Sequence, residues 1–150
     1  MLKEGAKAPA FKLPSDSGET IALKDLAGQR VILYFYPKDD TSGCTLEAKN
    51  FRDELAAFKK KKAVILGVSR DSVASHVKFK EKYDLNFPLL SDEDGSVCEK
   101  YGVWVEKSMY GKKYMGIERT TFLIDEEGRI ARIFPKVKVA EHCAEVLEAL

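Results

Sequence analysis

Two continuous apolar segments constrain most strongly what this chain can fold into. The segments VILYFY, at 31–36, and AVILGVS, at 63–69, contain no charged residue and are rich in β-branched and aromatic side chains. Such runs are typical of strands that are covered on both faces, as in a sheet that lies between layers of helices. The chain is therefore expected to build a central sheet that includes these two strands.

The segment between these strands has the pattern of a helix with one buried face. Its apolar residues recur at steps of three and four: Ala48, Phe51, Leu55 and Phe58. A step of four residues back from Ala48 reaches Cys44, so this cysteine begins the buried face. Strand, loop, helix and strand in this order form a βαβ unit.

The segments on either side complete a mixed α/β pattern. FKL and TIAL flank the turn-rich PSDSGE near the N-terminus, and RTTFLID and RIARIF flank EEG, so each pair is expected to be a hairpin. Helices are expected over 72–83 and 139–150, with a short strand over 88–90. Ser96 and Glu99 have the spacing of a capping box for a further short helix. The sequence predicts a mixed central sheet flanked by helices on both faces, with an N-terminal β-hairpin.

The length and composition are those of one globular domain, so residues 1–150 are expected to form a single one. The net charge of +1 gives no global basis for binding nucleic acid or an acidic membrane surface. No apolar run approaches the ~20 residues of a membrane-spanning helix, and the N-terminus lacks the pattern of a secretory signal. Three widely spaced cysteines do not form a disulfide framework, so a cytoplasmic location is expected.

Cys44 lies at the junction where the first strand has ended and the helix begins. Helix N-termini present unpaired N–H groups and a partial positive charge, which favour the thiolate, the reactive form of a thiol. Pro37 stiffens the entrance of the loop, and Gly43 lets the backbone come close to an approaching group. Thr41 or Ser42 is a candidate N-cap, and the Thr41 hydroxyl could also bond the sulfur or its substrate. A small buried apolar cysteine is the alternative interpretation, but these surroundings favour a reactive thiol.

Spacing excludes several other uses of this cysteine. A CxxC redox pair would need a cysteine at Thr41 or Glu47, and a phosphatase loop would need an arginine at Asn50. A zinc site needs about four convergent ligands, and the cysteines and two histidines show no metal spacing, so neither metal nor cofactor is expected. A papain-like pair with His76 or His142 stays open, without support from the sequence. His76, near the apolar edge of its helix, is interpreted as a packed or surface residue rather than a base.

A more specific signal is the segment PKDDTSGC, which fits the P-x-x-x-T-x-x-C motif of peroxiredoxins. Pro37, Thr41 and Cys44 stand at the matching positions. The chain also resembles the bacterioferritin comigratory protein (peroxiredoxin Q) subfamily in GCTLEAKNFRD, NFPLLSDEDGSVCEKYGVW and EKSMYGKKYMGIERTTFLIDEEG, and in the N-terminal segment from about residue 4. This resemblance implies a thioredoxin-like fold. It also implies that Cys44, as peroxidatic cysteine, reduces hydrogen peroxide and organic hydroperoxides.

The resemblance also implies roles for residues around the thiol. The donors to the peroxide oxygens would be the Thr41 hydroxyl, backbone N–H groups around Cys44, and Arg119, which precedes the strand TTFLID. Glu47 matches the subfamily's glutamate. Because an unpaired carboxylate disfavours a nearby thiolate, Glu47 is expected to pair with Arg119 or Arg52 as an orienting residue. A simple first-turn glutamate that favours the helix dipole is the alternative.

One part of the subfamily pattern is missing. The sulfenic acid that forms on a peroxidatic cysteine must be resolved by a second thiol. Many members carry that thiol five residues downstream, where this chain has Lys49, and others carry it on the helix matched by 72–83, which has no cysteine. Cys98, expected to be partly exposed, and then Cys143, on the apolar stripe of the last helix, remain as candidates. We expect a one-cysteine cycle reduced by thioredoxin or another thiol, in a monomer rather than a dimer.

Three other functions stay open. A redox sensor would also need a reactive Cys44, but it would not turn over peroxide repeatedly with a reducing system. A thiol–disulfide oxidoreductase is disfavoured because the CxxC pair is missing. A structural or chaperone-like module would leave Cys44 unreactive, which the combination of Pro37, Thr41, Cys44 and Arg119 argues against.

Overall fold

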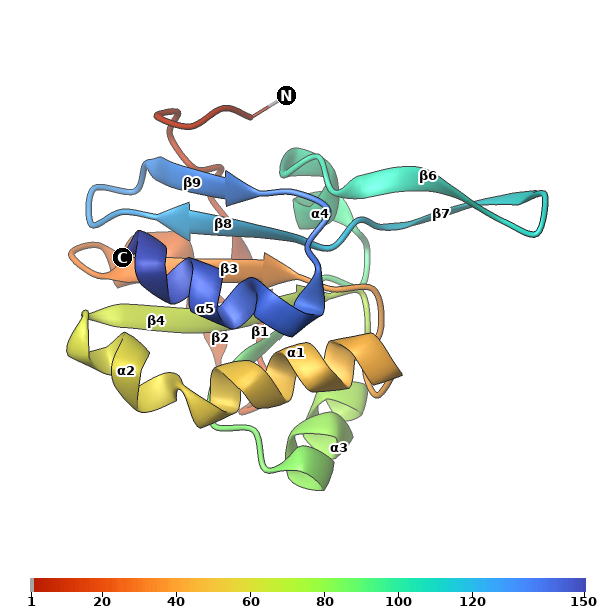
Figure 1. Cartoon of the computed structure of the whole chain (residues 1–150), viewed down its shortest axis with the longest axis horizontal. Coiled ribbons are helices and arrows are strands. Elements are labelled where there is room, and N and C mark those ends of the chain that lie inside the picture. The colour runs from red at the N-terminus through yellow and green to blue at the C-terminus, as the bar shows by residue number, and fades with distance from the viewer. Residues whose placement is uncertain (1) are drawn as a thin grey trace.

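The computed structural model describes residues 2–150 and is built on a five-stranded mixed sheet with the strand order β5-β4-β3-β8-β9 (Figure 1). Its strands are β3 (Arg30–Phe35), β4 (Ala63–Ser69), β5 (Leu89–Ser91), β8 (Thr120–Ile124) and β9 (Ile130–Phe134). The β3–β4 and β4–β5 pairs are parallel, whereas β8 runs antiparallel to both β3 and β9. The predicted mixed α/β fold with a central mixed sheet is confirmed.

Two smaller hairpins and five α-helices surround this sheet. The hairpins are β1 (Lys12–Pro14) with β2 (Thr20–Ala22), and β6 (Trp104–Met109) with β7 (Lys112–Ile117). The helices are α1 (Ser42–Asp53), α2 (Leu55–Lys60), α3 (Val73–Tyr83), α4 (Ser96–Lys100) and α5 (Val139–Ala149), with a short 3-10 helix, η1, at Leu23–Leu26. The expected hairpins at the N-terminus and around EEG are β1–β2 and β8–β9.

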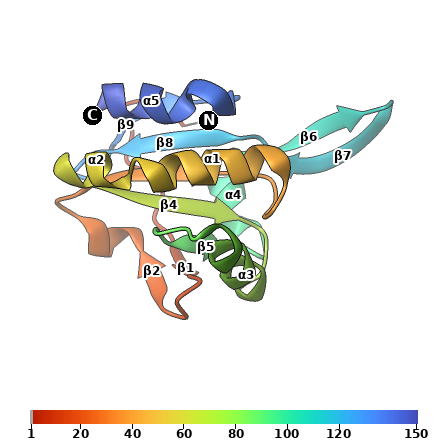
Figure 2. The same cartoon turned by 60° about the horizontal axis from the view of Figure 1, so that its bottom comes forward.

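The side chains of β3 alternate between two separate hydrophobic cores. Val31, Leu33 and Phe35 point to the face covered by the N-terminal segment and α4. Ile32, Tyr34 and Tyr36 point to the face covered by α1, α3 and α5. Figure 2 shows α1 and α5 on one side of the sheet and the β1–β2 hairpin on the other. Burial on both faces explains why this strand reads as a continuous apolar run.

Several details of the elements differ from the sequence prediction. The amphipathic segment after Cys44 is two helices, α1 and α2, because the backbone leaves the helical conformation at Glu54 (φ −103°, ψ 8°). Strand β5 begins at Leu89, one residue later than expected. The predicted capping box is wrong, since Ser96 is already helical and the first amides of α4 donate to the carboxylates of Asp92 and Asp94.

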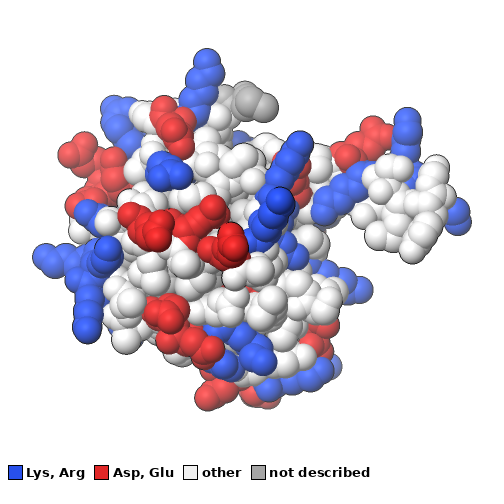
Figure 3. Space-filling view, in the orientation of Figure 1, with Lys and Arg blue, Asp and Glu red and all other residues white. Residues whose placement is uncertain are grey.

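The β6–β7 hairpin projects from the body of the molecule (Figures 1 and 2). Its turn is formed by Tyr110 and Gly111, which both have positive φ, as a two-residue type I′ hairpin requires. Tyr110 at the tip is 98% exposed. On the face seen in Figure 3, acidic and basic side chains are interspersed over the body and the hairpin. Of the helices in residues 2–150, none combines the length and apolar character that crossing a membrane requires.

Candidate active site

Cys44 lies in the first turn of α1, just beyond the C-terminal end of β3. Thr41 is the N-cap, and the first helical hydrogen bond joins the Thr45 amide to the Thr41 carbonyl at 2.8 Å. The amides of the first turn, including that of Cys44, therefore have no acceptor within the helix and lend their partial positive charge to this end. Only 1% of Cys44 is exposed, so the thiol is covered against a large molecule.

Arg119 contacts the sulfur of Cys44 although it lies 75 residues away in the sequence. Its Nη2 donates to Cys44 Sγ at 3.3 Å, and its Nη1 donates to Glu47 Oε1 at 2.6 Å. The antiparallel pairing of Phe35 with Thr120 sets β8 beside β3, so the residue before β8 lies beside the loop that follows β3. A Cβ added at Gly43 would lie 3.2 Å from Arg119 Nη2. The missing side chain of Gly43 therefore leaves room for the guanidinium of Arg119 beside the backbone.

Glu47 is buried one turn along α1 from Cys44 and pairs with Arg119, as one of the two expected pairings required. Burial raises the pKa of this carboxyl to about 7, against the opposing charge and hydrogen bond of Arg119. Its second oxygen, Oε2, has no hydrogen-bond partner among residues 2–150. Arg52, the other expected partner, instead bonds Asp53 at 2.8 Å and the Tyr83 carbonyl at 2.7 Å.

Thr41 occupies the expected N-cap position but does not use its side chain as a cap. Its exposed hydroxyl donates to the Lys38 carbonyl at 2.9 Å, and within the described chain it accepts no hydrogen bond from a helix amide. The hydroxyl thus joins Thr41 to the backbone of Lys38 within the same loop. Its proton is directed at Lys38 and not at the sulfur of Cys44.

Pro37 borders a surface groove between the loop and the β6–β7 hairpin. Aromatic and aliphatic side chains form much of its lining, which comprises Pro37, Arg70, Glu93, Trp104, Lys107, Tyr114, Met115, Gly116 and Ile117. Desolvation and then the charge of Arg119 lower the pKa of Lys107, one of the groove's lining residues. No feature of the sequence by itself indicated Arg70 or Lys107, because the hairpin that positions the groove was not predicted.

The two other cysteines are also buried. Cys98 is 0% exposed and belongs to the core on the other face of the sheet, so the expectation of partial exposure is wrong. The Cys143 thiol donates to the Asn50 carbonyl at 3.5 Å, and Asn50 is six residues, or about 9 Å of helix, beyond Cys44. Burial raises the pKa of both thiols, that of Cys143 to about 12. Cys98 and Cys44 lie in the cores on opposite faces of the sheet, so a disulfide between them, which needs Cα atoms within about 7 Å, would require the backbone to move.

Comparison with known proteins gives a consistent result. The model of the AhpC/TSA family matches residues 5–133. The chain is 60% identical to a putative peroxiredoxin bcp of Coxiella burnetii, covering 99% of both chains, and 53% identical to peroxiredoxin Bcp of Bacillus subtilis, covering 99% and 95%. The solved bacterioferritin comigratory protein of Xanthomonas campestris superposes with a TM-score of 0.92 at 44% identity, covering 98% of this chain and 96% of that one. By its sequence and its fold, this chain belongs to the peroxiredoxins of the AhpC/TSA family, in the bacterioferritin comigratory protein or peroxiredoxin Q group.

Proposed function

We propose that Cys44 is the peroxidatic nucleophile through which this peroxiredoxin reduces hydrogen peroxide and organic hydroperoxides. The observation that carries the proposal is the contact between Arg119 Nη2 and Cys44 Sγ at 3.3 Å. A guanidinium keeps its charge at any relevant pH, so it stabilises the thiolate and can donate to a peroxide oxygen at the same position.

The reaction needs no group beyond this chain and a thiol reductant. The Cys44 thiolate attacks one peroxide oxygen, an S–O bond forms, the O–O bond breaks, and the leaving alkoxide or hydroxide takes a proton from water. The products are a sulfenic acid on Cys44 and an alcohol or water. A first reductant thiol displaces water to form a mixed disulfide, and a second thiol releases reduced Cys44.

Each neighbouring residue has a defined part in this proposal. Arg119 and the free amides of the first turn of α1 stabilise the negative charge that develops on the leaving oxygen. Glu47 holds the guanidinium in place through Nη1, which leaves Nη2 directed at the sulfur. Thr41 offers the lone pairs of an exposed hydroxyl whose proton is already directed at Lys38, so it orients a substrate as an acceptor.

The groove bordered by Pro37 is the proposed site for the organic part of a hydroperoxide. Its apolar lining includes Trp104, Tyr114 and Ile117. The Xanthomonas campestris relative is described for its alkyl peroxide reduction activity, which supports this part of the proposal. Pro37, at the junction of loop and groove, keeps the entrance narrow because its ring fixes the backbone.

The proposed cycle uses one cysteine of this chain and an external thiol, with thioredoxin as the first reductant to test. The burial of Cys98 and Cys143 supports it, because burial raises the pKa of both thiols and Cys98 lies in the core on the other face of the sheet from Cys44. The proposed setting is a monomer in the cytoplasm.

The proposal is tested by adding one equivalent of hydrogen peroxide to the reduced protein and measuring its intact mass. We expect a gain of one oxygen that peptide mapping assigns to Cys44 and that a sulfenic-acid reagent traps. Cys44→Ser should abolish the gain, whereas Cys98→Ala and Cys143→Ala should retain it. A loss of two hydrogens in the monomer would overturn the one-cysteine cycle, and an unmodified Cys44 would overturn the peroxidase assignment. Repeated turnover with thioredoxin distinguishes an enzyme from a redox sensor.

A further inference from the structure

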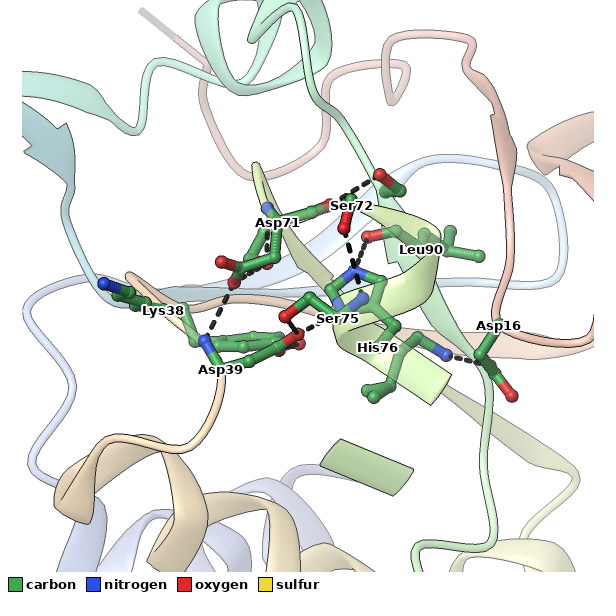
Figure 4. Close-up of polar contacts among 12 residues, drawn as sticks. Asp16, Lys38, Asp39, Asp71, Ser72, Ser75, His76 and Leu90 are labelled. Carbon is green, nitrogen blue, oxygen red and sulfur yellow. Dashed lines mark hydrogen bonds and ion pairs between the residues drawn. The ribbon is translucent and has the colours of Figure 1, made fainter. Parts of the chain in front are cut away.

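A buried polar network ties the loop before Cys44 to helix α3 (Figure 4). At its centre is Asp39, in the loop between β3 and α1. Its Oδ1 accepts a hydrogen bond from the Tyr36 hydroxyl at 2.6 Å, and its Oδ2 accepts one from the Ser75 hydroxyl at 2.7 Å. The same Oδ2 lies 2.7 Å from Nδ1 of His76, the next residue of α3. Nothing in the chemistry proposed above uses this network.

The partners of the His76 ring favour its charged form. Nε2 lies 2.8 Å from the Leu90 carbonyl, which can only accept, so Nε2 carries a hydrogen. Nδ1 lies 2.7 Å from Asp39 Oδ2, so a hydrogen on Nδ1 makes this contact a charge-assisted hydrogen bond. Burial disfavours a charged ring, yet the hydrogen bond and charge of Asp39 outweigh it and raise the pKa of His76.

The groups around His76 come from three further elements. Tyr36 at the end of β3 has its ring centroid 6.4 Å away, and Asp39 follows in the loop. Asp71 lies in the turn before α3, where its Oδ2 accepts hydrogen bonds from the Asp39 amide at 2.8 Å and the Ser69 hydroxyl at 2.6 Å. Strand β5 presents the Leu90 carbonyl. Asp39 is thus held by its backbone as well as by its side chain.

The same residues do not form a metal site. One ligand atom from each of Asp39, Asp71 and His76 lies within 4.8 Å of the others. The 2.7 Å between His76 Nδ1 and Asp39 Oδ2 is the length of a hydrogen bond. Two ligands at about 2.0–2.2 Å from a tetrahedral ion would be more than about 3 Å apart. The separation is that of a salt bridge.

Helix α3 also contacts the next loop residue and the far end of α1. The exposed Asp40 accepts hydrogen bonds from Lys82 at 2.8 Å and from the Tyr83 hydroxyl at 2.5 Å. Arg52, near the end of α1, donates to the Tyr83 carbonyl at 2.7 Å. Helix α1, which carries Cys44, and the loop before it therefore both form hydrogen bonds with α3. Of these contacts, the buried pair of Asp39 and His76 is the one shielded from solvent.

We propose that His76 and Asp39 are positioning residues of the peroxidase, because their ion pair locks the loop from Tyr36 to Thr41 against α3 and so holds Cys44 in its closed, peroxide-reactive place. This inference rests on the proposed function. Because Cys44 is 1% exposed, a reductant much larger than peroxide reaches the sulfur only when this loop moves away. The lock therefore sets the balance between reaction with peroxide and reaction with a bulky partner.

The test uses two matched histidine substitutions, His76→Gln and His142→Gln. His142 is as deeply buried and bonds Thr121 at 2.7 Å and Glu145 at 3.0 Å, but these hydrogen bonds join α5 to β8 and to itself and involve no residue of the loop. Two rates are measured: oxidation of Cys44 by hydrogen peroxide, and labelling of Cys44 by the bulky aromatic disulfide DTNB, assigned by peptide mapping. Urea unfolding gives the stability of each variant.

We expect His76→Gln to slow peroxide oxidation and to speed DTNB labelling, so that the ratio of the two rates changes by about tenfold or more, the shift in population that loss of a charge-assisted hydrogen bond produces. His142→Gln should lose stability while changing both rates less than about twofold. Rates that move in the same direction in His76→Gln, or equal rate ratios in the two variants, would overturn the lock.

Asp39→Asn separates the charge from the hydrogen bond. The new amide can donate to a neutral His76 and still accept from Tyr36, so this variant keeps the fold while it loses the ion pair. We expect its ratio of the two rates to lie between those of wild type and His76→Gln, and a wild-type ratio would overturn the ion pair as the lock. If wild-type Cys44 does not react with peroxide at all, the proposed function is refuted. The DTNB labelling rates do not depend on peroxide, so they distinguish this outcome from failure of the lock.

Discussion

At the scale of single residues, the site depends on one guanidinium that serves two partners. The planar fork of Arg119 sends Nη1 to Glu47 at 2.6 Å and Nη2 to Cys44 at 3.3 Å. A lysine ammonium is a single point charge on a flexible chain and cannot hold both groups in this geometry. The identity of this side chain, in addition to its charge, therefore matters for the reaction.

The first prediction is that Arg119→Lys lowers the rate of Cys44 oxidation by hydrogen peroxide about a hundredfold, as loss of one donor to developing charge typically does. Single-turnover stopped-flow fluorescence measures this rate. Arg30→Lys is the matched control, because Arg30 only pairs with Glu126 at 3.5 Å near the surface. A loss of less than about threefold in Arg119→Lys would contradict the role assigned to the guanidinium.

The second prediction concerns the dependence of stability on pH through Glu47. Burial raises its pKa to about 7 in the folded protein, whereas the ordinary value is 4.5. The folded state thus binds this proton more tightly, and the resulting stability is present below pH 4.5 and lost as the pH rises through about 7. From pH 5 to pH 8 the unfolding free energy of wild type should fall by about 1–3 kcal/mol relative to Glu47→Gln. Urea unfolding at both pH values measures it, and an unchanged difference would argue against a proton on Glu47.

At the scale of elements, two buried histidines occupy opposite electrostatic environments. His76 on α3 faces the carboxyl group of Asp39 and a backbone carbonyl, whereas His142 on α5 faces the Thr121 hydroxyl, which can donate to its Nε2. Burial lowers the pKa of His142 because Glu145 compensates only in part. Burial of a histidine therefore does not by itself decide its charge; the hydrogen-bond partners do.

The third prediction follows from this contrast. Near pH 6.5, the ordinary pKa of histidine, ring 15N shifts should show His76 protonated on both nitrogens and His142 as a neutral tautomer. The stabilisation from the His76–Asp39 pair is fully present below that pH and is lost as the pH rises through the raised pKa of His76. In Asp39→Asn the signal of His76 should become that of a neutral ring. A neutral His76 in wild type at this pH would exclude the charged pair.

Elements were predictable from the sequence where burial shapes the pattern. Strands β3 and β4 are buried on both faces, so their apolar runs and the βαβ unit were recognisable. The β6–β7 hairpin was missed because its strands are largely exposed and its turn is Tyr110–Gly111 in place of the usual Asn-Gly. Cys98 was misjudged because the short helix α4 buries both of the adjacent residues Val97 and Cys98, and not only the expected Val97.

The site was only partly predictable, since its members are distant in sequence. Cys44 could be inferred locally from the strand, loop and helix around it. Arg119 lies 75 residues away and reaches the sulfur through the β3–β8 pairing, which no local pattern reveals, so it came from the family resemblance alone. His76 was placed correctly on its helix, but its partner Asp39 is 37 residues away. Long-range hydrogen bonds depend on which elements lie side by side in the fold. The spacing of apolar residues predicts single helices and strands but not this arrangement.

At the scale of the whole molecule, the projecting hairpin forms one wall of the groove that leads to Pro37. Tyr114 lies in this wall, whereas Tyr110 is at the exposed tip and is not among the lining residues. The hairpin therefore adds apolar surface near the thiol without contributing a group that the reaction itself needs. Reaction with a bulky hydroperoxide should depend on this wall, and reaction with hydrogen peroxide should not.

The fourth prediction is that Tyr114→Ser raises the KM for cumene hydroperoxide about three- to tenfold, consistent with the loss of part of an aromatic contact area. The rate with hydrogen peroxide should stay unchanged. Tyr110→Ser, a matched substitution on the same hairpin, should change neither value. Steady-state assays with a thiol reducing system measure both, and equal effects on the two substrates would show that the groove does not select for the organic group.

The hairpin has one more consequence, which concerns the chain's connectivity. Its tip lies between Cys44 and Arg119 in sequence and outside the body in space. A backbone cut between Tyr110 and Gly111 would divide the site between two polypeptides, one with the thiol and the other with the guanidinium and β8. Peroxide reactivity would then return only when β8 pairs again with β3. The two fragments would therefore form a split reporter, and oxidation of the Cys44 sulfur would measure how much of it has assembled.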